Sequence, residues 1–500
     1  MRTELSYKNV GAFFDDIAAK RKENTFLIDP QTNEHVSYGQ AKIYVDKTAN
    51  FLLGLGIKKN EKIAYIGLNS LQVIYVFYAC QKIGAVFHPI NPELSREELE
   101  YVLENSDTVC AFCDEKNREK VPSLPKLRNI FDASLLSLIK EQRNELADMN
   151  ADLDNESVLM YSSGTTGRPK GIILTQKNIL YGGHSIMRGL GYDKKSVLLV
   201  NLPLFFSGGL FPNLVAGTCA GACCVIQPKF SKSHFWKMVK KYGVTNTHVV
   251  PTMLSYLLNN PQKIEKHEIH QLRYVITSAA ACPVALIEEF TSVFGKKIID
   301  AYGLTENTAF TTINDVSNPA IGSIGIPLDI AEMKVVDLEG KEVADGVEGE
   351  IIIKGPHIFK EYYKNPEATK KGLKNGWLYS GDLGYRKDHH YYVSGRIKEI
   401  IIKGGENISP VAVDRVFYKH KAVMDAATIG VPDKHYGEEV VTYIVLKEGE
   451  NANEGELLEF CKDHLENFKC PKRIIFTDSI PKGPSGKLLR RELLEKYKKN

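Results

Sequence analysis

The segment YSSGTTGRPKG, residues 161–171, combines hydroxyl side chains, glycines and basic residues, and an apolar run lies on each side of it. Hydroxyl groups and the backbone N–H groups of a glycine-rich turn can converge on an anion, and a lysine adds a mobile positive charge. A P-loop is excluded, because its spacing is absent and the next run, GIILT, is typical of a strand. A plain polar hairpin turn is the alternative. We predict a phosphate-binding loop made by Ser162, Ser163, Gly164, Thr165, Thr166, Gly167 and Lys170.

A second polar group, AYGLTE, follows the strand-like run KKIID. We expect it at the C-terminal end of a strand, where open α/β sheets bind ligands. The carboxylate of Glu306 is a hard oxygen ligand of the kind that Mg²⁺ prefers, although a lone glutamate is more often a surface charge. The other residues of this group that could contact a ligand are Tyr302, Gly303 and Thr305.

Two further charged residues have types that suit nucleotide chemistry. Asp382 in SGDLG could accept hydrogen bonds from two vicinal hydroxyls, as a ribose offers. Lys487 lies in the basic C-terminal tail, in the segment SGKLLR. In another context Lys487 would be part of a solvated turn, which is what we expect for Lys482 nearby.

These motifs, together with two others, occur in the order found in the adenylate-forming superfamily, which includes acyl-CoA synthetases, aryl-CoA ligases, luciferases and the adenylation domains of peptide synthetases. The chain resembles that superfamily over most of its length, and most closely a stand-alone acyl-CoA synthetase. The matching segments are YSSGTTGRPKG (161–171), AYGLTENT (301–308), IGSIGIPL (321–328), YSGDLGY (379–385), GRIKEIIIKGGENISP (395–410) and PKGPSGKLLR (481–490).

The resemblance implies that ATP, together with Mg²⁺, binds at this loop. It implies that Thr165 and Glu306 hold Mg²⁺ and contribute to catalysis, and that the residue at 305 contacts the α-phosphate. It also implies that Tyr302 packs on adenine. The ribose ligands implied are Asp382 and Arg396.

The resemblance further implies a mobile lid. Lys487 becomes the catalytic lysine of adenylation, delivered when the C-terminal module closes over the rest of the chain. Lys398 matches the hinge position, which absorbs the rotation between two half-reactions. Gly404 and Gly405 would line a tunnel for the pantetheine thiol of coenzyme A, with a simple hairpin turn as the alternative.

The expected acyl pocket has two parts. The segment SAAACP resembles the family's small-residue stretch where adenine and acyl group meet, and it places Ala280 beside the nucleotide and Ala279 and Ala281 beside the acyl group; Cys282 stands where proline is more usual. The second part is PLFFSGGL, in which Phe206 replaces a usual histidine. Its apolar character favours a fatty or aromatic acid over an amino acid. The pocket residues predicted from it are Phe205, Phe206 and Gly208.

Three functions remain open at this point. The first is an acid–thiol ligase that forms an acyl-adenylate from ATP, releases pyrophosphate and transfers the acyl group to coenzyme A. The second is a stand-alone enzyme that loads a carrier-protein phosphopantetheine. The third is a non-catalytic acyl or nucleotide sensor, which is disfavoured because Lys487, Glu306 and the loop hydroxyls are all present. The state could be a monomer or a homodimer.

The elements that must position these residues alternate between strand and helix patterns. EKIAYIG, AVFHPI and TVCAFCD read as strands, and the segments between them as helices, the first capped by Asn69 and closed by Gly84, the second beginning with a capping box of Ser95 and Glu98. We therefore expect an α/β fold: a large N-terminal body of stacked α/β sheets with a distorted β-barrel-like subdomain, and a small mobile α+β lid. The predicted domains are 1–395, the ATP- and acyl-binding body, and 396–500, the lid.

Composition narrows the class of protein. The 500-residue chain is 43% hydrophobic and 25% charged with a net charge of +3, which argues against nucleic-acid binding. Nine cysteines without paired spacing predict reduced thiols, although Cys110 and Cys113 form one isolated C-x-x-C. Acidic residues interrupt any secretory signal, and prolines break the most apolar stretch, so we expect a cytoplasmic protein without a transmembrane segment.

Overall fold

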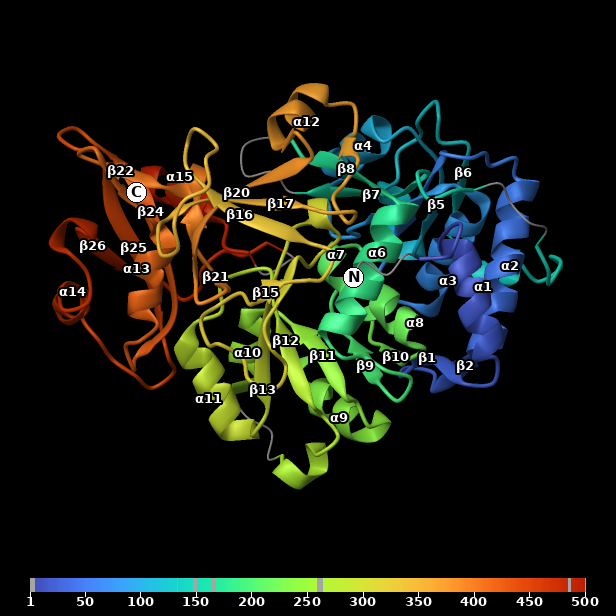
Figure 1. Cartoon of the computed structure of the whole chain (residues 1–500), viewed down its shortest axis with the longest axis horizontal. Helices are drawn as coiled ribbons and strands as arrows, with labels where there is room; N and C mark the ends of the chain where they lie inside the picture. Colours follow the sequence, from blue (N-terminus) through green and yellow to red (C-terminus); the bar gives the residue numbers. More distant parts are fainter. Residues whose placement is uncertain are drawn as a thin grey trace.

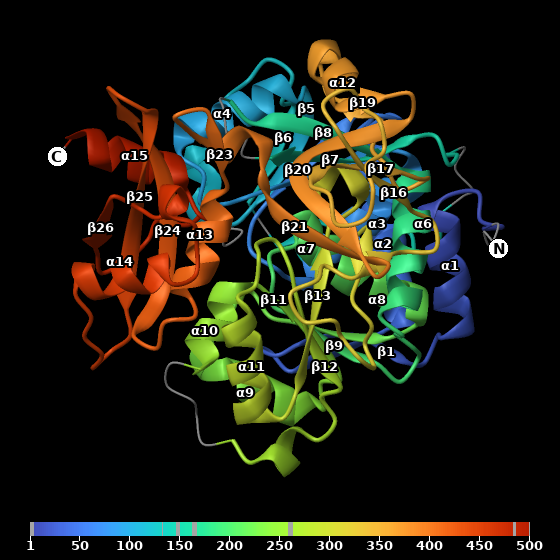
Figure 2. The same cartoon turned by 60° about the vertical axis from the view of Figure 1, so that its left-hand side comes forward.

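The computed structural model describes residues 5–132, 134–146, 151–162, 168–258, 264–483 and 487–499. Figure 1 shows a mixed α/β body, coloured blue through yellow to light orange, and a C-terminal module in darker orange and red that lies to one side of it. The same separation is visible after a 60° rotation in Figure 2. The α/β class expected from the alternating patterns is confirmed.

The first large sheet has nine strands in the order β15-β14-β13-β12-β11-β9-β10-β1-β2. Its central strands, from β13 to β1, are parallel, and antiparallel strands close both edges. The strands are β1 (Thr25–Asp29), β2 (Glu34–Ser37), β9 (Val197–Val200), β10 (Cys223–Ile226), β11 (Asn246–Val249), β12 (Tyr274–Thr277), β13 (Lys297–Tyr302), β14 (Thr312–Ile313) and β15 (Ile326–Pro327).

The second large sheet has seven strands in the order β18-β8-β7-β4-β3-β5-β6. Strands β7, β4, β3, β5 and β6 are parallel, so their carboxyl ends lie along one edge. The strands are β3 (Lys62–Ile66), β4 (Val86–Ile90), β5 (Thr108–Cys113), β6 (Asn129–Phe131), β7 (Glu156–Ser162), β8 (Lys170–Thr175) and β18 (Glu361–Tyr362).

Two smaller sheets follow along the chain. The third sheet is antiparallel and forms the barrel-like part of the body; its strands are β16 (Glu332–Val336), β17 (Gly349–Lys354), β19 (Leu373–Lys374), β20 (Trp377–Lys387) and β21 (His390–Arg396). The fourth belongs to the C-terminal module; its strands are β22 (Ile401–Lys403), β23 (Glu406–Ile408), β24 (Val423–Asp433), β25 (Gly437–Leu446) and β26 (Arg473–Phe476).

Helices cover both large sheets and the module. Those of the body are α1 (Val10–Lys20), α2 (Tyr38–Gly54), α3 (Leu71–Ile83), α4 (Arg96–Asn105), α5 (Leu135–Leu138), α6 (Gln176–Gly189), α7 (Ser207–Gly209), α8 (Ala216–Ala220), α9 (Lys232–Tyr242), α10 (Pro251–Leu258), α11 (Val284–Phe294) and α12 (Pro366–Gly372). Those of the module are α13 (Pro410–Phe417), α14 (Glu454–Lys462) and α15 (Arg490–Lys499). Short helical turns include η1 (Glu115–Lys120), η2 (Leu210–Val215), η3 (Lys266–Ile269), η4 (Thr305–Asn307), η5 (Ile397–Glu399) and η6 (Asn467–Lys469).

The predicted β-α-β-α-β run is present, with one correction at a helix start. Gly84 ends α3 with a positive φ of 70°, and Ser95 and Glu98 form the expected capping box of α4. The cap of α3, however, is Ser70, whose hydroxyl accepts from Val73 N. Asn69 instead binds backbone atoms of the loops after β9 and β10, because those loops lie beside it in the fold.

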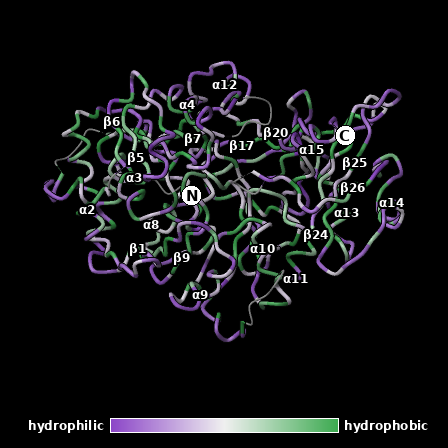
Figure 3. The backbone as a smooth tube through the Cα atoms, turned by 180° about the vertical axis from the view of Figure 1, so that it is seen from behind, coloured by the Kyte–Doolittle hydropathy of each residue, from purple (hydrophilic) through white to green (hydrophobic). Residues whose placement is uncertain are grey.

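The largest hydrophobic cluster joins both large sheets through helices α3 and α6, and nearly all of α3 is buried. In Figure 3 the strands at the centre are mostly green and the outer loops mostly purple, so the apolar material lies between the layers. The long apolar stretch from β9 to β10 is part of this core. No helix in the described parts of the chain is long and apolar enough to cross a membrane.

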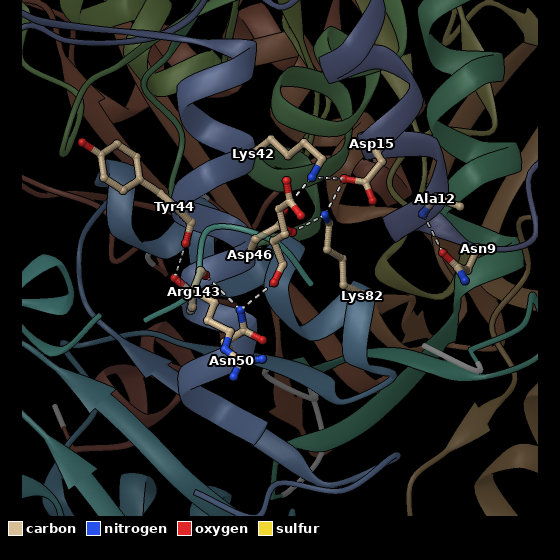
Figure 4. Close-up of polar contacts among 11 residues, drawn as sticks. Asn9, Ala12, Asp15, Lys42, Tyr44, Asp46, Asn50, Lys82 and Arg143 are labelled. Atoms are coloured by element: carbon tan, nitrogen blue, oxygen red, sulfur yellow. Dashed lines mark hydrogen bonds and ion pairs between the residues drawn. The ribbon is translucent and has the colours of Figure 1, made fainter. Parts of the chain in front are cut away.

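Helices α1, α2 and α3 meet at a buried charge cluster (Figure 4). Lys82 of α3 pairs with Asp15 of α1 and with Asp46 of α2, whose side chain is 0% exposed. Lys42, one turn before Asp46, pairs with its other oxygen. Burying such charges is costly unless each is paired, so the cluster fixes how the three helices pack without being a strong source of stability.

Candidate functional site

The best-defined polar contact of the site joins strands β13, β20 and β21. Asp382 and Arg396 are register partners in β20 and β21, and Arg396 Nε lies 2.8 Å from Asp382 Oδ1. Tyr302, the last residue of β13, donates its hydroxyl to Asp382 Oδ2 at 2.7 Å. Burial, and then the Asp382 charge, raise the pKa of Tyr302 well above its usual value. The structure thus brings three predicted nucleotide ligands together from two sheets.

Glu306 is held by a contact between distant segments. It lies in η4, three residues after Gly303, and its Oε1 accepts a hydrogen bond of 2.8 Å from the hydroxyl of Tyr362. Tyr362 belongs to β18, the edge strand beside β8. Lys170, the first residue of β8, places Nζ 5.3 Å from the centre of the Tyr362 ring. The end of the predicted phosphate loop and Glu306 are therefore linked through one tyrosine.

The core of the phosphate loop lies outside the described residues. This applies to Ser163, Gly164, Thr165, Thr166 and Gly167, so their predicted contacts stay predictions. The flanking residues follow the expected pattern: Ser162 ends β7 and is the register partner of Lys170, which begins β8. The loop therefore connects two antiparallel strands, as the flanking apolar runs predict.

Lys487 lies within electrostatic reach of the nucleotide residues of the body. Its side chain keeps access to solvent, yet the surrounding protein lowers the pKa of its ammonium below the usual value. Desolvation is the largest cause and the charge of Arg396 is the second, while carboxylates at Asp382, Glu306 and Glu399 act in the opposite direction. Lys487 of the C-terminal module is therefore close enough to Arg396, Asp382 and Glu306 to interact with their charges.

Arg490 anchors the segment that carries Lys487. Its guanidinium lies 2.7 Å from Asp414 Oδ2 of α13 and 3.2 Å from Glu399 Oε2, and it also donates to the backbone oxygen of Thr428 at 2.8 Å. Asp414 is buried, so this pair is shielded from water. Arg490, three residues after Lys487, therefore attaches this segment to the rest of the module.

The connection between body and module runs through the predicted hinge. Lys398 lies exposed in η5, between the last body strand and the first strand of the module. Ser409 precedes α13 but does not cap it, because its hydroxyl donates to the backbone oxygen of Ser394 instead. Gly404 and Gly405, with φ of 58° and 90°, form the turn between β22 and β23. Their role in a thiol tunnel stays a prediction.

The predicted acyl residues lie beside the nucleotide residues. Ser207, which follows Phe205 and Phe206, has its Oγ 3.2 Å from Thr305 Oγ1. The rings of Phe205 and Phe206 meet edge to face with centroids 4.7 Å apart. Phe205, Phe206 and Gly208 are half-buried, Ala279 and Ala281 are exposed, and Ala280 is half-buried. Ala279 has a φ of 73°, a strained value for a residue with a side chain.

Sequence reasoning missed several residues that the fold places at the site. Asp300 lies two residues before Tyr302 and is buried; desolvation raises its pKa to about 8, while Arg415 of the module acts in the opposite direction. The sequence signal for Asp300 was an acid directly after the two isoleucines of the strand-like run KKIIDAYG. His248 and Ser278 also reach the acyl segment. Nothing in the sequence around Tyr362 distinguishes it from the adjacent Tyr363, because its hydrogen-bond partner, Glu306, is 56 positions away.

Two other expectations concern isolated residues. Lys482 is not a solvated turn residue: it is ion-paired with Asp425 and its side chain is only 23% exposed. Cys110 and Cys113 are buried in β5, and all nine cysteines are free. Cys282 is buried as well, and burial and the nearby Asp300 raise the pKa of its thiol.

A Mg²⁺ ion fits the donor set at Glu306. Tyr362 occupies Oε1, which leaves Oε2 without a hydrogen bond from any described residue. No group of three or more acidic, histidine or cysteine side chains in the described parts of the chain could hold a metal alone. Mg²⁺ is commonly bound by one or two carboxylates together with phosphate oxygens and water, so a single glutamate beside a triphosphate suits it.

Comparisons with known proteins agree with this geometry. The profile of the "AMP-binding enzyme" family matches residues 14–363, and that of the "AMP-binding enzyme C-terminal domain" matches residues 412–487. A sulfoacetate–CoA ligase of Cupriavidus necator is 33% identical over 490 residues, covering 95% of this chain and 96% of the relative. An oxalate–CoA ligase of Arabidopsis thaliana is 32% identical, covering 91% and 92%. Among solved structures, the anthranilate CoA ligase AuaEII in complex with anthranoyl-AMP has a TM-score of 0.92 at 26% identity, covering 99% of this chain and 98% of that one.

Proposed function

This chain belongs to the AMP-binding enzyme family, and from that premise we propose how its residues divide the work of an AMP-forming acid–thiol ligase. The overall reaction has two steps. A carboxylic acid and ATP give an acyl-adenylate and pyrophosphate, and the thiol of coenzyme A then displaces AMP to give a thioester. The observation that supports the assignment most is the meeting of Tyr302, Asp382, Arg396 and Lys487 from distant segments.

In the first step we assign the nucleotide to the edge formed by β13, β20 and β21. Asp382 accepts hydrogen bonds from the ribose, with Arg396 beside it, and Tyr302 packs on the base. Thr305 contacts the α-phosphate, and the loop after Ser162 contacts the other phosphates. Glu306, with Thr165, would hold Mg²⁺, which offsets phosphate charge when bound. Lys487 bridges the attacking carboxylate and the α-phosphate and thereby lowers their mutual repulsion.

In the second step the module must leave this position. The backbone at Lys398 would absorb the rotation of the module. Lys398 lies between Arg396, which is ion-paired within the body, and β22, which belongs to the module. Rotation withdraws Lys487 and brings the Gly404–Gly405 turn toward the body to line the path of the thiol. The division at residue 396 into body and lid is part of this proposal.

A basic cavity supports coenzyme A as the acceptor. A cavity of about 330 Å³ is lined by Leu68, Pro92, Glu93, Lys116, Asn117, Lys120 and Lys229. It lies past the carboxyl ends of β3, β4 and β5, where the strand order reverses, which is the usual ligand position in open α/β sheets. The side-chain nitrogen of Asn117 is buried without a partner among the described residues. We assign the phosphates of coenzyme A to this cavity. Strand β3, at whose carboxyl end the cavity lies, is two strand spacings, or about 10 Å, from β7.

The acid is a fatty or aromatic one on the evidence of the apolar segment around Phe205 and Phe206. The acids in the names of the relatives range from sulfoacetate to anthranilate, so the names do not choose among them. For the location we propose the cytoplasm, because ATP and coenzyme A are available there, and for the state a monomer or homodimer. Loading of a carrier protein is the alternative acceptor.

A screen of acids by pyrophosphate and AMP release tests the proposal, with coenzyme A, free pantetheine and a holo-carrier protein as separate acceptors. We expect AMP release that coenzyme A accelerates. Lys116→Ala combined with Lys229→Ala should raise the KM for coenzyme A and leave that for pantetheine unchanged, because pantetheine lacks the nucleotide phosphates. Faster transfer to the carrier than to coenzyme A would favour the alternative, and no AMP release with any acid would refute the proposal.

A further inference from the structure

A buried serine and a buried histidine form a polar pair at the acyl segment. His248, in β11, is 0% exposed, and Ser278, the residue after β12, is 5% exposed. His248 Nε2 lies 2.7 Å from Ser278 Oγ, and His248 Nδ1 lies 3.0 Å from the backbone oxygen of Gly208. Phe310 packs edge to face on the imidazole with centroids 5.3 Å apart. The adenylation residues assigned above make no use of this pair.

The hydrogen bonds determine which way the protons point. A backbone carbonyl can only accept, so Nδ1 of His248 carries the hydrogen toward Gly208. Desolvation lowers the pKa of His248 to about 4, so the ring is neutral at physiological pH and Nε2 is an acceptor. The hydroxyl of Ser278 must therefore donate to Nε2. No described residue donates to Ser278 Oγ, which leaves its lone pairs to accept one more hydrogen bond.

The pair lies where the acyl group of an adenylate would extend. Thr305, assigned to the α-phosphate, touches Ser207, and the next residue, Gly208, touches His248. A Cβ on Gly208 would come within 3.6 Å of His248 Cε1, so the missing side chain leaves this side of the imidazole open. On the other side, Ala279 follows Ser278 with a strained positive φ and is exposed.

We propose that Ser278, oriented by His248, is the specificity-determining residue of the acyl pocket and selects an acid whose hydrocarbon or aromatic part carries a neutral hydrogen-bond donor, such as a hydroxyl. The proposal rests on the ligase function given above. The rings of Phe205 and Phe206, which directly precede Ser207 and Gly208, suit an apolar body for that acid. A second carboxylate or sulfonate is disfavoured, because it would face an oxygen lone pair beside a neutral ring, and no cation among the described residues contacts this pair.

Acid pairs that differ only in one group test this directly. The probes are benzoate against its hydroxybenzoate isomers, cinnamate against its hydroxycinnamate isomers, octanoate against hydroxyoctanoates, and terephthalate and sulfobenzoate as acids with a second anion. The measured quantity is kcat/KM for AMP release in the presence of coenzyme A. We expect at least one hydroxy acid to exceed its parent by roughly tenfold to a hundredfold, since a site built around a hydrogen bond rejects a partner that lacks it.

Ser278→Ala should reduce that ratio to about one, whatever its effect on the rate with the parent acid. The ratio compares two acids on one protein sample, so partial unfolding does not alter it. Ser106→Ala is the matched control, because Ser106 is also buried and bonded, to Leu103 and Thr108, but lies on the far end of α4. This control should lose similar stability and keep the wild-type ratio.

The outcomes separate the two proposals. AMP release without preference for any hydroxy acid, an unchanged ratio in Ser278→Ala, or a second-anion acid as the best substrate overturns the assignment of Ser278 and leaves the ligase function intact. The wild-type comparison alone decides this if Ser278→Ala does not fold. No AMP release with any acid overturns the ligase function, and the assignment of Ser278 falls with it.

Discussion

Arg396 and Asp382 face each other across two adjacent strands, with Nε and Oδ1 2.8 Å apart, one residue before the chain turns into the hinge segment. The pair joins the last two strands of the body at the proposed ribose position, directly before the proposed hinge. A ligand bound at Asp382 would therefore contact the ion-pair partner of Arg396, a residue next to the proposed hinge at Lys398.

Asp382→Asn should weaken ATP binding by roughly tenfold to a hundredfold, because hydrogen bonds to a charged group contribute about 1.5–3 kcal/mol. The sharper expectation concerns the sugar: the wild type should prefer ATP over 2′-deoxy-ATP and 3′-deoxy-ATP, and the variant should lose part of that preference. Calorimetric titration with each nucleotide measures this. Asp388→Asn, on the exposed turn of the same hairpin, is the control. A variant that keeps the full preference would move the ribose elsewhere.

Lys487→Ala should slow acyl-adenylate formation by roughly a hundredfold to a thousandfold, the usual effect of removing one group that stabilises transition-state charge. ATP binding should change little, since Lys487 approaches only when the module closes. Pyrophosphate exchange reports the first quantity and equilibrium titration the second. Lys496→Ala, an exposed lysine on α15, should behave like the wild type. Normal exchange by Lys487→Ala would exclude this lysine from the chemistry.

Tyr362→Phe should raise the Mg²⁺ concentration needed for half-maximal activity by about tenfold or more, because loss of a residue that orients a metal ligand commonly costs that much affinity. Binding of Mn²⁺ with a non-hydrolysable ATP analogue, followed by electron paramagnetic resonance, gives a readout independent of turnover. Tyr363→Phe is a matched control, since the hydroxyl of Tyr363 binds Asp107 instead of Glu306. Equal Mn²⁺ affinity in both variants would show that Tyr362 only packs.

Asp300 should make the protein less stable as pH rises. Its folded pKa of about 8 lies above that of an unfolded aspartate, about 3.9, so the folded state holds a proton that the unfolded state has lost between these values. Stability is thus lost from about pH 4 to pH 8, by an amount on the order of 4 kcal/mol at pH 7. Asp300→Asn should gain melting temperature over the wild type from pH 5 to pH 8.5.

The control for this prediction is Asp154→Asn, an exposed aspartate, whose difference from the wild type should not vary over that range. Arg415→Met should steepen the loss, because Arg415 favours the charged form of Asp300. Parallel pH profiles for the wild type and Asp300→Asn would mean that Asp300 ionises normally in the folded protein.

Lys82→Met should lower the free energy of unfolding by about 3–5 kcal/mol, because it leaves Asp46 fully buried with one partner fewer. The double change Lys82→Met with Asp46→Asn should recover part of that loss. Urea denaturation measures both. Lys20→Met removes the exposed pair of α1 with Asp16, whose lysine is 63% exposed, and should cost less than about 1 kcal/mol. Similar losses in Lys20→Met and Lys82→Met would show that burial does not distinguish the two pairs.

The sequence alone was sufficient for much of the local structure and for the family. Strands and helices from β3 to β5 followed from apolar periodicity and from the caps at Ser95 and Gly84, because these signals act between residues a few positions apart. The six motifs indicated the superfamily and named Glu306, Asp382 and Lys487, since each motif is a short run with its chemistry in its own side chains.

Only the tertiary structure decided the contacts between segments. Asn69 looked like a helix cap, but two loops more than a hundred positions away compete for its amide. Tyr362 on Glu306, Arg490 on Asp414 and His248 on Ser278 each depend on elements that meet only after the sheets assemble. Burial has the same origin, because the charge state of Asp300 is set by what packs around it. Such effects depend on distance in space, which spacing along a chain does not report.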